Sequence, residues 1–292
     1  MNSPKAYASI LVAVLLWSAS FVLVKIGLTE VTPIYLAALR FSLATVVFAG
    51  CALAKFEMCQ IKTFTKNNFA TLFALGIVGV TLPNISQNLG MRHITASMSS
   101  ILQNSSPTFT LVLAAIFLHE SLGYRKVSGL ALSLTGVTII SLNGGFSPLG
   151  DSMVFYGNLM LLFSAACYSI YTIIGKKIVA NNSPLLILAV STLMGTVLLD
   201  LISITVEPVE FAYPANIWGI ILGLSILCTV IGTLLYFEAL RELEASKTNF
   251  FTFLIPVFAI IQASVFLAER IYLYQIGCGV LIIGGIWLAQ TE

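Results

Sequence analysis

The sequence predicts an all-α membrane protein with ten transmembrane helices, arranged as two inverted five-helix repeats. Three observations carry this prediction. Hydrophobic residues make up 58% of the 292 residues, charged residues only 9%, and the mean hydropathy is +0.99. A soluble domain carries roughly 25% charged residues, so a chain this apolar needs lipid as its solvent. The other two observations are an internal repeat and a one-sided distribution of positive charge.

The repeat is visible as residues of the first half that recur in the second half, 148 to 151 positions later. A duplicated set of membrane helices is a common basis for a transporter, because substrate can bind where the two halves meet. The Gly/Pro-rich linker 143–151 separates the copies, so we predict repeats over 1–147 and 148–292. The recurring pairs are Lys25/Lys176, Pro33/Pro184, Arg92/Arg241, Ala96/Ala245, Ser97/Ser246, Pro107/Pro256, Glu120/Glu269, Gly129/Gly277 and Gly136/Gly284.

Ten stretches are long and apolar enough to span a membrane, which takes about 20 mostly apolar residues. The first runs from Ala6 to about Lys25; it is long enough to span and shows no A-x-A cleavage site, so we predict a helix and not a signal peptide. The predicted spans are 6–25, 34–54, 69–90, 95–118, 126–143, 155–175, 184–205, 216–238, 246–268 and 272–290.

Lysine and arginine predict the orientation, because cytoplasmic loops are enriched in them. The loops on one side hold only Lys25, Arg92 and Arg270. The distribution therefore puts both termini in the cytoplasm, with the protein in the inner membrane. Five spans per repeat is an odd number, so the second repeat enters the membrane upside down, which favours alternating access. The loops on the other side hold Lys5, Lys55, Lys62, Lys66, Arg125, Lys126, Lys176, Lys177, Arg241 and Lys247.

Two prolines occupy matching positions, Pro107 in the fourth span and Pro256 in the ninth. Proline lacks a backbone donor and leaves the carbonyl four residues earlier unpaired, here at Gln103 and Thr252. A single proline can be merely tolerated in a membrane helix. Two at equivalent positions favour helix kinks that border a central cavity and flex during transport.

Polar side chains form stripes on the third and fourth spans. An amide that faces lipid has unpaired groups, so each stripe must face protein or water. Hydrogen bonding between helices explains such stripes too, and membrane bundles use it routinely. Because two consecutive spans carry stripes, we favour a polar substrate cavity. The stripes, at helical spacing, are Asn84, Gln87, Asn88 and Met91, then Ser100, Gln103, Asn104 and Pro107.

Aromatic residues correspond across the repeats, since Trp17 in the first span matches Tyr168 in the sixth. Rings that carry a polar atom suit a wet cavity holding a partly apolar ligand, although ordinary helix packing explains the pair equally well. Polar residues of the eighth and ninth spans complete the predicted site. The predicted cavity residues are Trp17, Ser20, Asn84, Gln87, Asn88, Ser100, Gln103, Asn104, Tyr168, Tyr171, Thr172, Thr229, Tyr236, Asn249 and Thr252.

Acidic residues are scarce within the spans, which argues against an obligatorily cationic substrate. Glu238 and Asp200 lie near span ends, and Glu238 is the candidate for proton coupling. Glu120 and Glu269 begin loops and are expected to pin helix ends. Arg40 lies some seven residues into the second span and could reach outward or pair. We expect no metal or cofactor, because neither the two histidines nor the five scattered cysteines show a ligand spacing.

The ordered set of these features resembles the EamA-type transporters of the drug/metabolite transporter superfamily. That resemblance implies ten helices in inverted repeats, a central cavity formed largely by spans 1, 3, 4, 6, 8 and 9, and export of small metabolites, often amino acids. The small four-helix multidrug members of that superfamily use a glutamate within their first span. The first span here has no Asp or Glu, so the resemblance disfavours efflux of cationic drugs. The segments that carry it are Leu16–Phe21 with Lys25, Arg40-Phe41, Ala96-Ser97, Pro107, Glu120, Gly129, Gly136, Tyr236–Leu240, Ala245-Ser246, Pro256, Glu269, Gly277 and Gly284.

We therefore predict an inner-membrane alternating-access carrier, not an enzyme, that exports or exchanges small metabolites, amino acids first among them. The alternatives are a carrier for sugars, nucleosides, phosphorylated compounds or other organic metabolites. A membrane-embedded enzyme and a non-transporting scaffold are alternatives of a different class. The expected partners are a small-molecule substrate and the lipid bilayer. We expect no nucleic acid, because the net charge is only +2, and a monomer or weak dimer.

Overall fold

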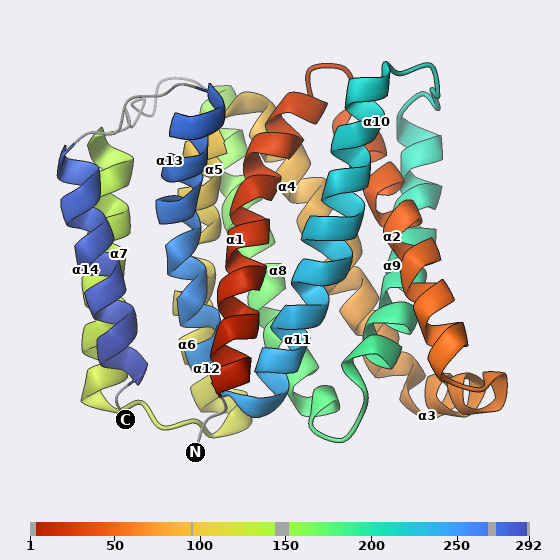
Figure 1. Cartoon of the computed structure of the whole chain (residues 1–292), viewed down its shortest axis with the longest axis horizontal. Helices are drawn as coiled ribbons and strands as arrows, with labels where there is room; N and C mark the ends of the chain where they lie inside the picture. The colour runs from red at the N-terminus through yellow and green to blue at the C-terminus, as the bar shows by residue number, and fades with distance from the viewer. Residues whose placement is uncertain (1–3, 95, 144–151, 268–272, 291–292) are drawn as a thin grey trace.

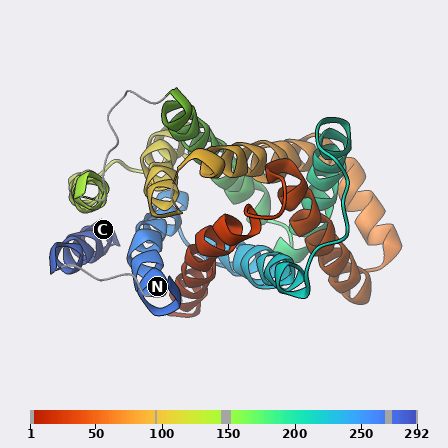
Figure 2. The same ribbon diagram turned by 90° about the horizontal axis from the view of Figure 1, so that it is seen from above.

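The computed structural model describes residues 4–94, 96–143, 152–267 and 273–290, and every regular element in these ranges is a helix. The helices run side by side in one bundle, with both termini at the same end (Figure 1). Seen from above, they form a flat, elongated array in which helices of the two halves intermix (Figure 2).

The first half contains α1 (Pro4–Gly27), α2 (Pro33–Lys55), α3 (Met58–Gly76), the π-helix η1 (Ile77–Thr81), α4 (Leu82–His93), α5 (Ala96–Gln103), α6 (Ser106–Leu118) and α7 (Tyr124–Asn143). The second half contains α8 (Ser152–Val179), α9 (Pro184–Val206), α10 (Ala215–Leu222), the π-helix η2 (Gly223–Ile231), α11 (Gly232–Glu242), α12 (Ala245–Phe250), the 3₁₀ turn η3 (Phe251–Phe253), α13 (Leu254–Leu267) and α14 (Leu273–Gln290).

Within the described part of the chain, six helical segments are long and apolar enough to cross a membrane. Two shorter apolar helices, Ser106–Leu118 and Ile276–Ala289, fall below that length. The multi-pass, all-helical class agrees with the sequence prediction, whereas the count of ten spans stays a prediction. The six long segments are Pro4–Gly27, Pro33–Lys55, Met58–His93, Met153–Val179, Pro184–Val206 and Ala215–Glu242.

The predicted fourth and ninth spans, 95–118 and 246–268, are not continuous helices. In the fourth, α5 ends at Gln103, and Pro107 is the second residue of α6. In the ninth, the 3₁₀ turn η3 separates α12 from α13, and Pro256 is the third residue of α13. Proline removes one backbone donor and its ring collides with the preceding turn, so both helices are interrupted just before it. The predicted kinks are therefore breaks at equivalent places of the two halves.

The third and eighth spans carry a second kind of irregularity, which the sequence did not predict. Each contains a π-helical stretch, and Val80 of η1 and Thr229 of η2 are equivalent residues, 149 positions apart. π-helical turns are rare and are frequently found at functional sites. The third span also begins earlier than the predicted residue 69. Helix α3 starts at Met58 and has a non-helical Asn68, where its first part turns aside at the end of the bundle (Figure 1).

Helix contacts come in pairs that correspond when the two halves are exchanged. Helix α1 packs on α11 and α13, and its equivalent α8 packs on α4 and α6. Equivalent helices also meet directly, α2 with α9 and α7 with α14. Thr45 and Thr196, which are 151 positions apart, share a hydrogen bond of 2.9 Å between their hydroxyls. These contacts are those expected of two related halves, although the inverted repeat itself stays a prediction.

Two equivalent lysines bind equivalent helix ends. Lys25 Nζ donates to the carbonyls of Met91 (2.7 Å) and Ile94 (2.8 Å), at the end of α4. Lys176 Nζ donates to the carbonyls of Leu240 (2.8 Å) and Leu243 (2.6 Å), at the end of α11. The last carbonyls of a helix lack partners within it and attract cations. Each lysine therefore holds the end of a helix within its own half.

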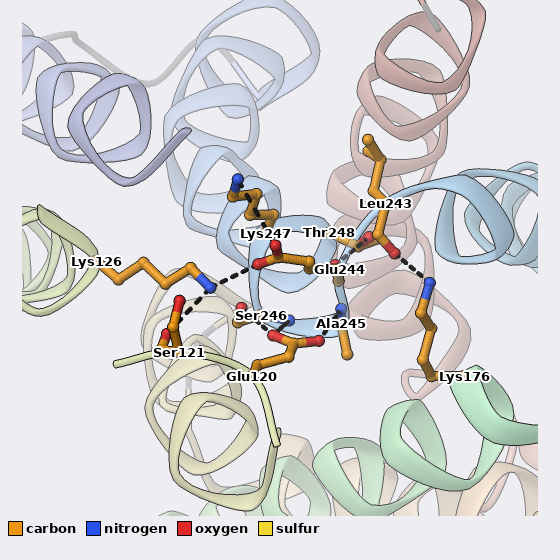
Figure 3. Close-up of polar contacts among 10 residues, drawn as sticks. All are labelled: Glu120, Ser121, Lys126, Lys176, Leu243, Glu244, Ala245, Ser246, Lys247 and Thr248. Atoms are coloured by element: carbon orange, nitrogen blue, oxygen red, sulfur yellow. Dashed lines mark hydrogen bonds and ion pairs between the residues drawn. The ribbon is translucent and has the colours of Figure 1, made fainter. Parts of the chain in front are cut away.

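A further polar network joins the halves at the start of α12 (Figure 3). Glu120, just beyond α6, accepts hydrogen bonds from the amides of Ala245 (2.7 Å) and Ser246 (3.2 Å) and from the Ser246 hydroxyl. The Glu244 carboxylate lies 2.5 Å from Lys126 Nζ and 3.9 Å from Lys247 Nζ. Glu120 thus pins a helix end, as predicted for it. Its equivalent, Glu269, lies outside the described residues.

Candidate functional site

A cavity lies between the two halves, with walls contributed by both. About 100 Å³ of it is accessible to the centre of a water-sized sphere. One water needs roughly 10–15 Å³ on that measure, so the space suits a ligand of on the order of eight non-hydrogen atoms. The lining residues are Trp17, Ser20, Phe21, Arg40, Phe41, Phe48, Gly79, Val80, Gln87, Gln103, Asn104, Ser106, Tyr168, Tyr171, Thr172, Thr192, Thr229, Thr233, Tyr236, Asn249, Thr252 and Ile255.

Aromatic rings from both halves form one wall of the cavity. Trp17 of α1 packs against Tyr236 of α11, with ring centroids 5.0 Å apart. The indole Nε1 donates to the carbonyl of Cys228 (3.0 Å), and the Tyr236 hydroxyl is 2.7 Å from Thr172 Oγ1. These polar atoms are bonded within the protein. The wall therefore offers fixed apolar faces to a ligand.

The π-helical turn η1 brings backbone against the Tyr171 ring. A Cβ atom on Gly79 would lie 2.3 Å from two ring carbons of Tyr171, a distance that real contacts do not show. Only glycine lets the ring lie this close to the chain. Gly79 belongs to η1 and Thr229 to η2, and both residues line the cavity. Both π-helical segments therefore form part of the cavity wall.

Amide oxygens at the broken fourth span lack partners. Gln103 Oε1 and Asn104 Oδ1 are buried and accept no hydrogen bond among the described residues. Asn104 Nδ2 bonds instead to the Ser100 carbonyl (2.5 Å), one turn back. From the other half, Asn249 Nδ2 donates to Ser106 Oγ (2.9 Å). An unpaired buried acceptor costs about 1–3 kcal/mol, so these two oxygens are suited to a ligand with N–H or O–H donors.

Most residues predicted for the cavity lie on its wall, except Asn84, Asn88 and Ser100. Asn84 Nδ2 donates to the Val80 carbonyl (2.8 Å), and Asn88 Nδ2 donates to the Pro33 carbonyl (2.9 Å). For these two amides the structure agrees with the alternative interpretation of the stripes, which is hydrogen bonding within the bundle. Ser100 lies one turn before Asn104, at the buried end of the stripe, where its carbonyl binds the Asn104 side chain.

Arg40 lines the cavity but was not among the predicted cavity residues, since the sequence left open whether it reaches outward or pairs. It neither reaches outward nor meets a carboxylate within 4.0 Å in the described part of the chain. Its side chain is 8% exposed, and its Nε donates to Thr229 Oγ1 (2.6 Å). A charge this far inside a span was the available signal, since intramembrane charges usually face the bundle interior. The apolar lining residues gave no such signal, because lipid-facing and cavity-facing side chains look alike in a sequence.

The acidic candidates lie away from the cavity. Glu238 pairs with Arg241 (3.1 Å), and both side chains are more than two-fifths exposed. Asp200 accepts hydrogen bonds from Ser42 Oγ (2.9 and 3.1 Å). No group of three His, Cys, Asp or Glu that could hold a metal ion occurs among the residues the structure describes.

The placement of Glu238 leads to a prediction about coupling. Glu238→Gln is expected to leave transport and any dependence on a pH gradient unchanged within about twofold, because a half-exposed carboxylate paired with an exposed arginine contributes little. Uptake into proteoliposomes with and without a gradient measures this. Loss of gradient dependence in the variant would instead restore Glu238 as the proton-coupling residue.

Comparison with known proteins gives consistent results over almost the whole chain. The model of the EamA-like transporter family matches residues 4–142 and again 155–291. An uncharacterized transporter of Archaeoglobus fulgidus is 28% identical over 99% of both chains. A probable terminal-alkyne amino-acid exporter of Streptantibioticus cattleyicolor is 25% identical over 100% of this chain and 95% of its own.

A solved structure supports the fold alone. One crystal structure matches with a TM-score of 0.80 and 18% sequence identity, covering 99% of this chain and 97% of that chain. The helix arrangement described above is therefore shared with a protein of known structure.

Proposed function

This chain belongs to the EamA-like transporter family, and we propose that it carries small polar or zwitterionic metabolites across the membrane, amino acids first among them. The observation that carries the proposal is the cavity between the two halves, which combines a fixed aromatic wall with unpaired amide oxygens. Binding sites for small molecules are typically apolar clefts with a few converging polar groups.

Amino acids come first for two reasons. The cavity volume of about 100 Å³ suits a ligand of that size. One relative over the full length is named as a probable amino-acid exporter, at 25% identity. Other organic metabolites, such as sugars or nucleosides, would use the same amides but leave the charge of Arg40, which lines the cavity, unpaired.

Alternating access is the mechanism we propose for the transport. It is supported by helix contacts that correspond between halves, by breaks at equivalent places and by equivalent lysines on equivalent helix ends. Two related halves can exchange conformations and so expose one site to either side. The strongly one-sided distribution of Lys and Arg favours cytoplasmic termini, with the inner membrane as the proposed location.

The direct test is uptake by proteoliposomes that contain the purified full-length protein. A mixed pool of labelled amino acids is offered with and without a pH gradient. Uptake above protein-free vesicles supports the proposal, and the gradient arm separates coupled from facilitated transport. Absence of uptake in both arms, from folded protein, would move the proposal to other metabolites.

The cavity assignment makes its own prediction. Gln103→Ala and Asn104→Ala are each expected to lower transport about tenfold while leaving the folded yield nearly unchanged, because each removes an acceptor that has no partner among the described residues. Asn216→Ala, at an exposed position of α10, is the matched control and should transport normally. Wild-type rates in both cavity variants would contradict the assignment.

A further inference from the structure

We infer that Arg40 is the anion-binding residue of the cavity, so that a substrate must carry a carboxylate or a similar single anionic group. The inference rests on the proposed function and narrows its substrate class. A compound that differs from a substrate only by loss of that anionic group, such as the amine left after removal of a carboxylate, is not bound. For a zwitterion, Arg40 binds the carboxylate, and the bare oxygens of Gln103 and Asn104 accept from the ammonium group.

The first argument is that Arg40 is buried with most of its donors unused. Its side chain is 8% exposed and lines the cavity. A guanidinium carries five N–H donors, and the bond from Nε to Thr229 Oγ1 is the one hydrogen bond seen within the described residues. The Phe41 ring beneath it, 5.3 Å from the guanidinium carbon, adds a stacking surface but no acceptor. The two terminal nitrogens are therefore available to a ligand.

The second argument is that the protein does not neutralise this charge. No carboxylate lies within 4.0 Å of Arg40 in the described ranges. Asp200 of α9 contacts α2 through Ser42, whose hydroxyl donates to its carboxylate. Ser42 is two positions after Arg40, which on a helix turns a side chain about 200° away. An isolated buried charge is unfavourable unless it is paired, and an anionic substrate supplies the missing partner.

The third argument is that Thr229 fixes the guanidinium plane. The Thr229 hydroxyl donates to the Leu224 carbonyl (2.9 Å), so its oxygen is free to accept from Arg40 Nε (2.6 Å). With Nε held, the two terminal nitrogens form a fork with the geometry that binds a carboxylate through two parallel hydrogen bonds. Thr229 is thus a positioning residue, placed by the π-helical segment η2.

The fourth argument is that the described lining of the cavity contains one charged group, with no counterpart at the equivalent position of the other half. Arg40 is the only charged residue among the described residues that line the cavity. Its repeat equivalent, 151 positions later, is Ser191, and the equivalent of Thr229 is Val80. The pseudosymmetry of the helices is broken at this point, so one end of the cavity binds an anion and the other does not. A ligand with one anionic group matches that asymmetry.

The test measures ligand-induced thermal stabilisation of the purified full-length protein, with ligands offered in pairs. Each pair differs only in the anionic group: an amino acid and its decarboxylated amine, a monocarboxylic acid and the corresponding alcohol, a phosphate monoester and its alcohol. The variants are Arg40→Met and Arg40→Lys, with Arg92→Met as the matched control at an exposed position of α4. Transport of the same compounds is measured in proteoliposomes.

We expect at least one anionic member, and none of its uncharged or cationic partners, to stabilise the wild type and the Arg92→Met control. Arg40→Met is expected to weaken that binding by about 10- to 100-fold, and Arg40→Lys less, since lysine keeps the charge without the fork. Without ligand, Arg40→Met should unfold at an equal or higher temperature, because it removes an unpaired buried charge. A purely structural arginine would show the opposite change.

The outcomes separate this inference from the proposed function. If amino acids are transported and Arg40→Met transports them with unchanged affinity, the inference fails while the proposed function stands. If only organic acids or phosphate esters bind, and do so through Arg40, the inference stands and the assignment to amino acids falls. Equal stabilisation by both members of every pair, or by neither, overturns the inference.

Discussion

Gly76→Ala is expected to lower the free energy of unfolding by about 2–3 kcal/mol, the upper range for forcing an extra group into a packed interior. A Cβ atom on Gly76 would lie 2.7 Å from the Gly195 amide nitrogen and 2.8 Å from the Ser191 carbonyl oxygen. These are backbone atoms of α9, which cannot rotate aside as a side chain can. The added methyl group must therefore push α3 and α9 apart, and this contact joins the two halves.

A matched substitution gives the opposite result. Gly50→Ala, at an exposed position of α2, would place its Cβ with nothing within 4 Å. Alanine in an exposed helix stabilises by about 0.5–1 kcal/mol relative to glycine, so this variant should equal or exceed the wild type. Heating detergent-solubilised samples and measuring the fraction that stays monodisperse compares the three proteins. Equal midpoints for both variants would contradict the close approach of α3 to α9.

The membrane class and the six long apolar segments could be predicted from hydropathy, because lipid imposes a length and a composition on any helix that crosses it. The positions of the breaks in the fourth and ninth spans could be predicted, but not whether each helix would bend or be interrupted. Pro107 and Pro256 indicate where a helix must deviate, whereas the choice of a kink or a full interruption depends on neighbouring helices. The π-helical segments η1 and η2 left no local signal, since their extra residue per turn follows from packing rather than from any residue type.

The cavity shows the same division between local pattern and tertiary context. Gln103 and Asn104 could be predicted from helical spacing, because an amide stripe cannot face lipid. The same reasoning could not separate them from Asn84 and Asn88, whose amides bind backbone carbonyls inside the bundle. Arg40 was visible as an intramembrane charge, but its direction depends on Thr229, which lies 189 positions away in the chain.

The network at the start of α12 breaks the repeat in another way. Glu244 corresponds to Thr95 and Lys247 to Met98, 149 positions earlier in each case. The paired charges lie at the end of the bundle that holds the termini (Figure 1), and their repeat equivalents in the sequence are uncharged. If the halves exchange conformations during transport, the two ends are held closed by different chemistry. Salt should accordingly affect one end more than the other, because it screens charges near the surface.

Glu244→Gln is expected to lower the free energy of unfolding by about 2–3 kcal/mol. Glu244 lies beside two lysines whose side chains are almost fully buried, Lys126 at 1% exposure and Lys247 at 7%. Removing one partner of a buried ion pair typically costs about 3–5 kcal/mol, because the other charge stays buried without compensation. We expect less here, since Glu244 itself is 44% exposed and partly screened by solvent.

Glu238→Gln is a close control for this effect. Glu238 is 41% exposed, nearly the same as Glu244, and also forms an ion pair, but with Arg241 at 43% exposure. Its loss should change stability by less than about 0.5 kcal/mol, because both charges can return to solvent. The stability difference therefore depends on the burial of the partner and not on the glutamate.

The double variant Lys126→Met with Glu244→Gln should be more stable than Glu244→Gln alone, since it removes a buried charge that has lost its carboxylate. If thermal unfolding showed no such recovery, Lys126 would not be the source of the cost.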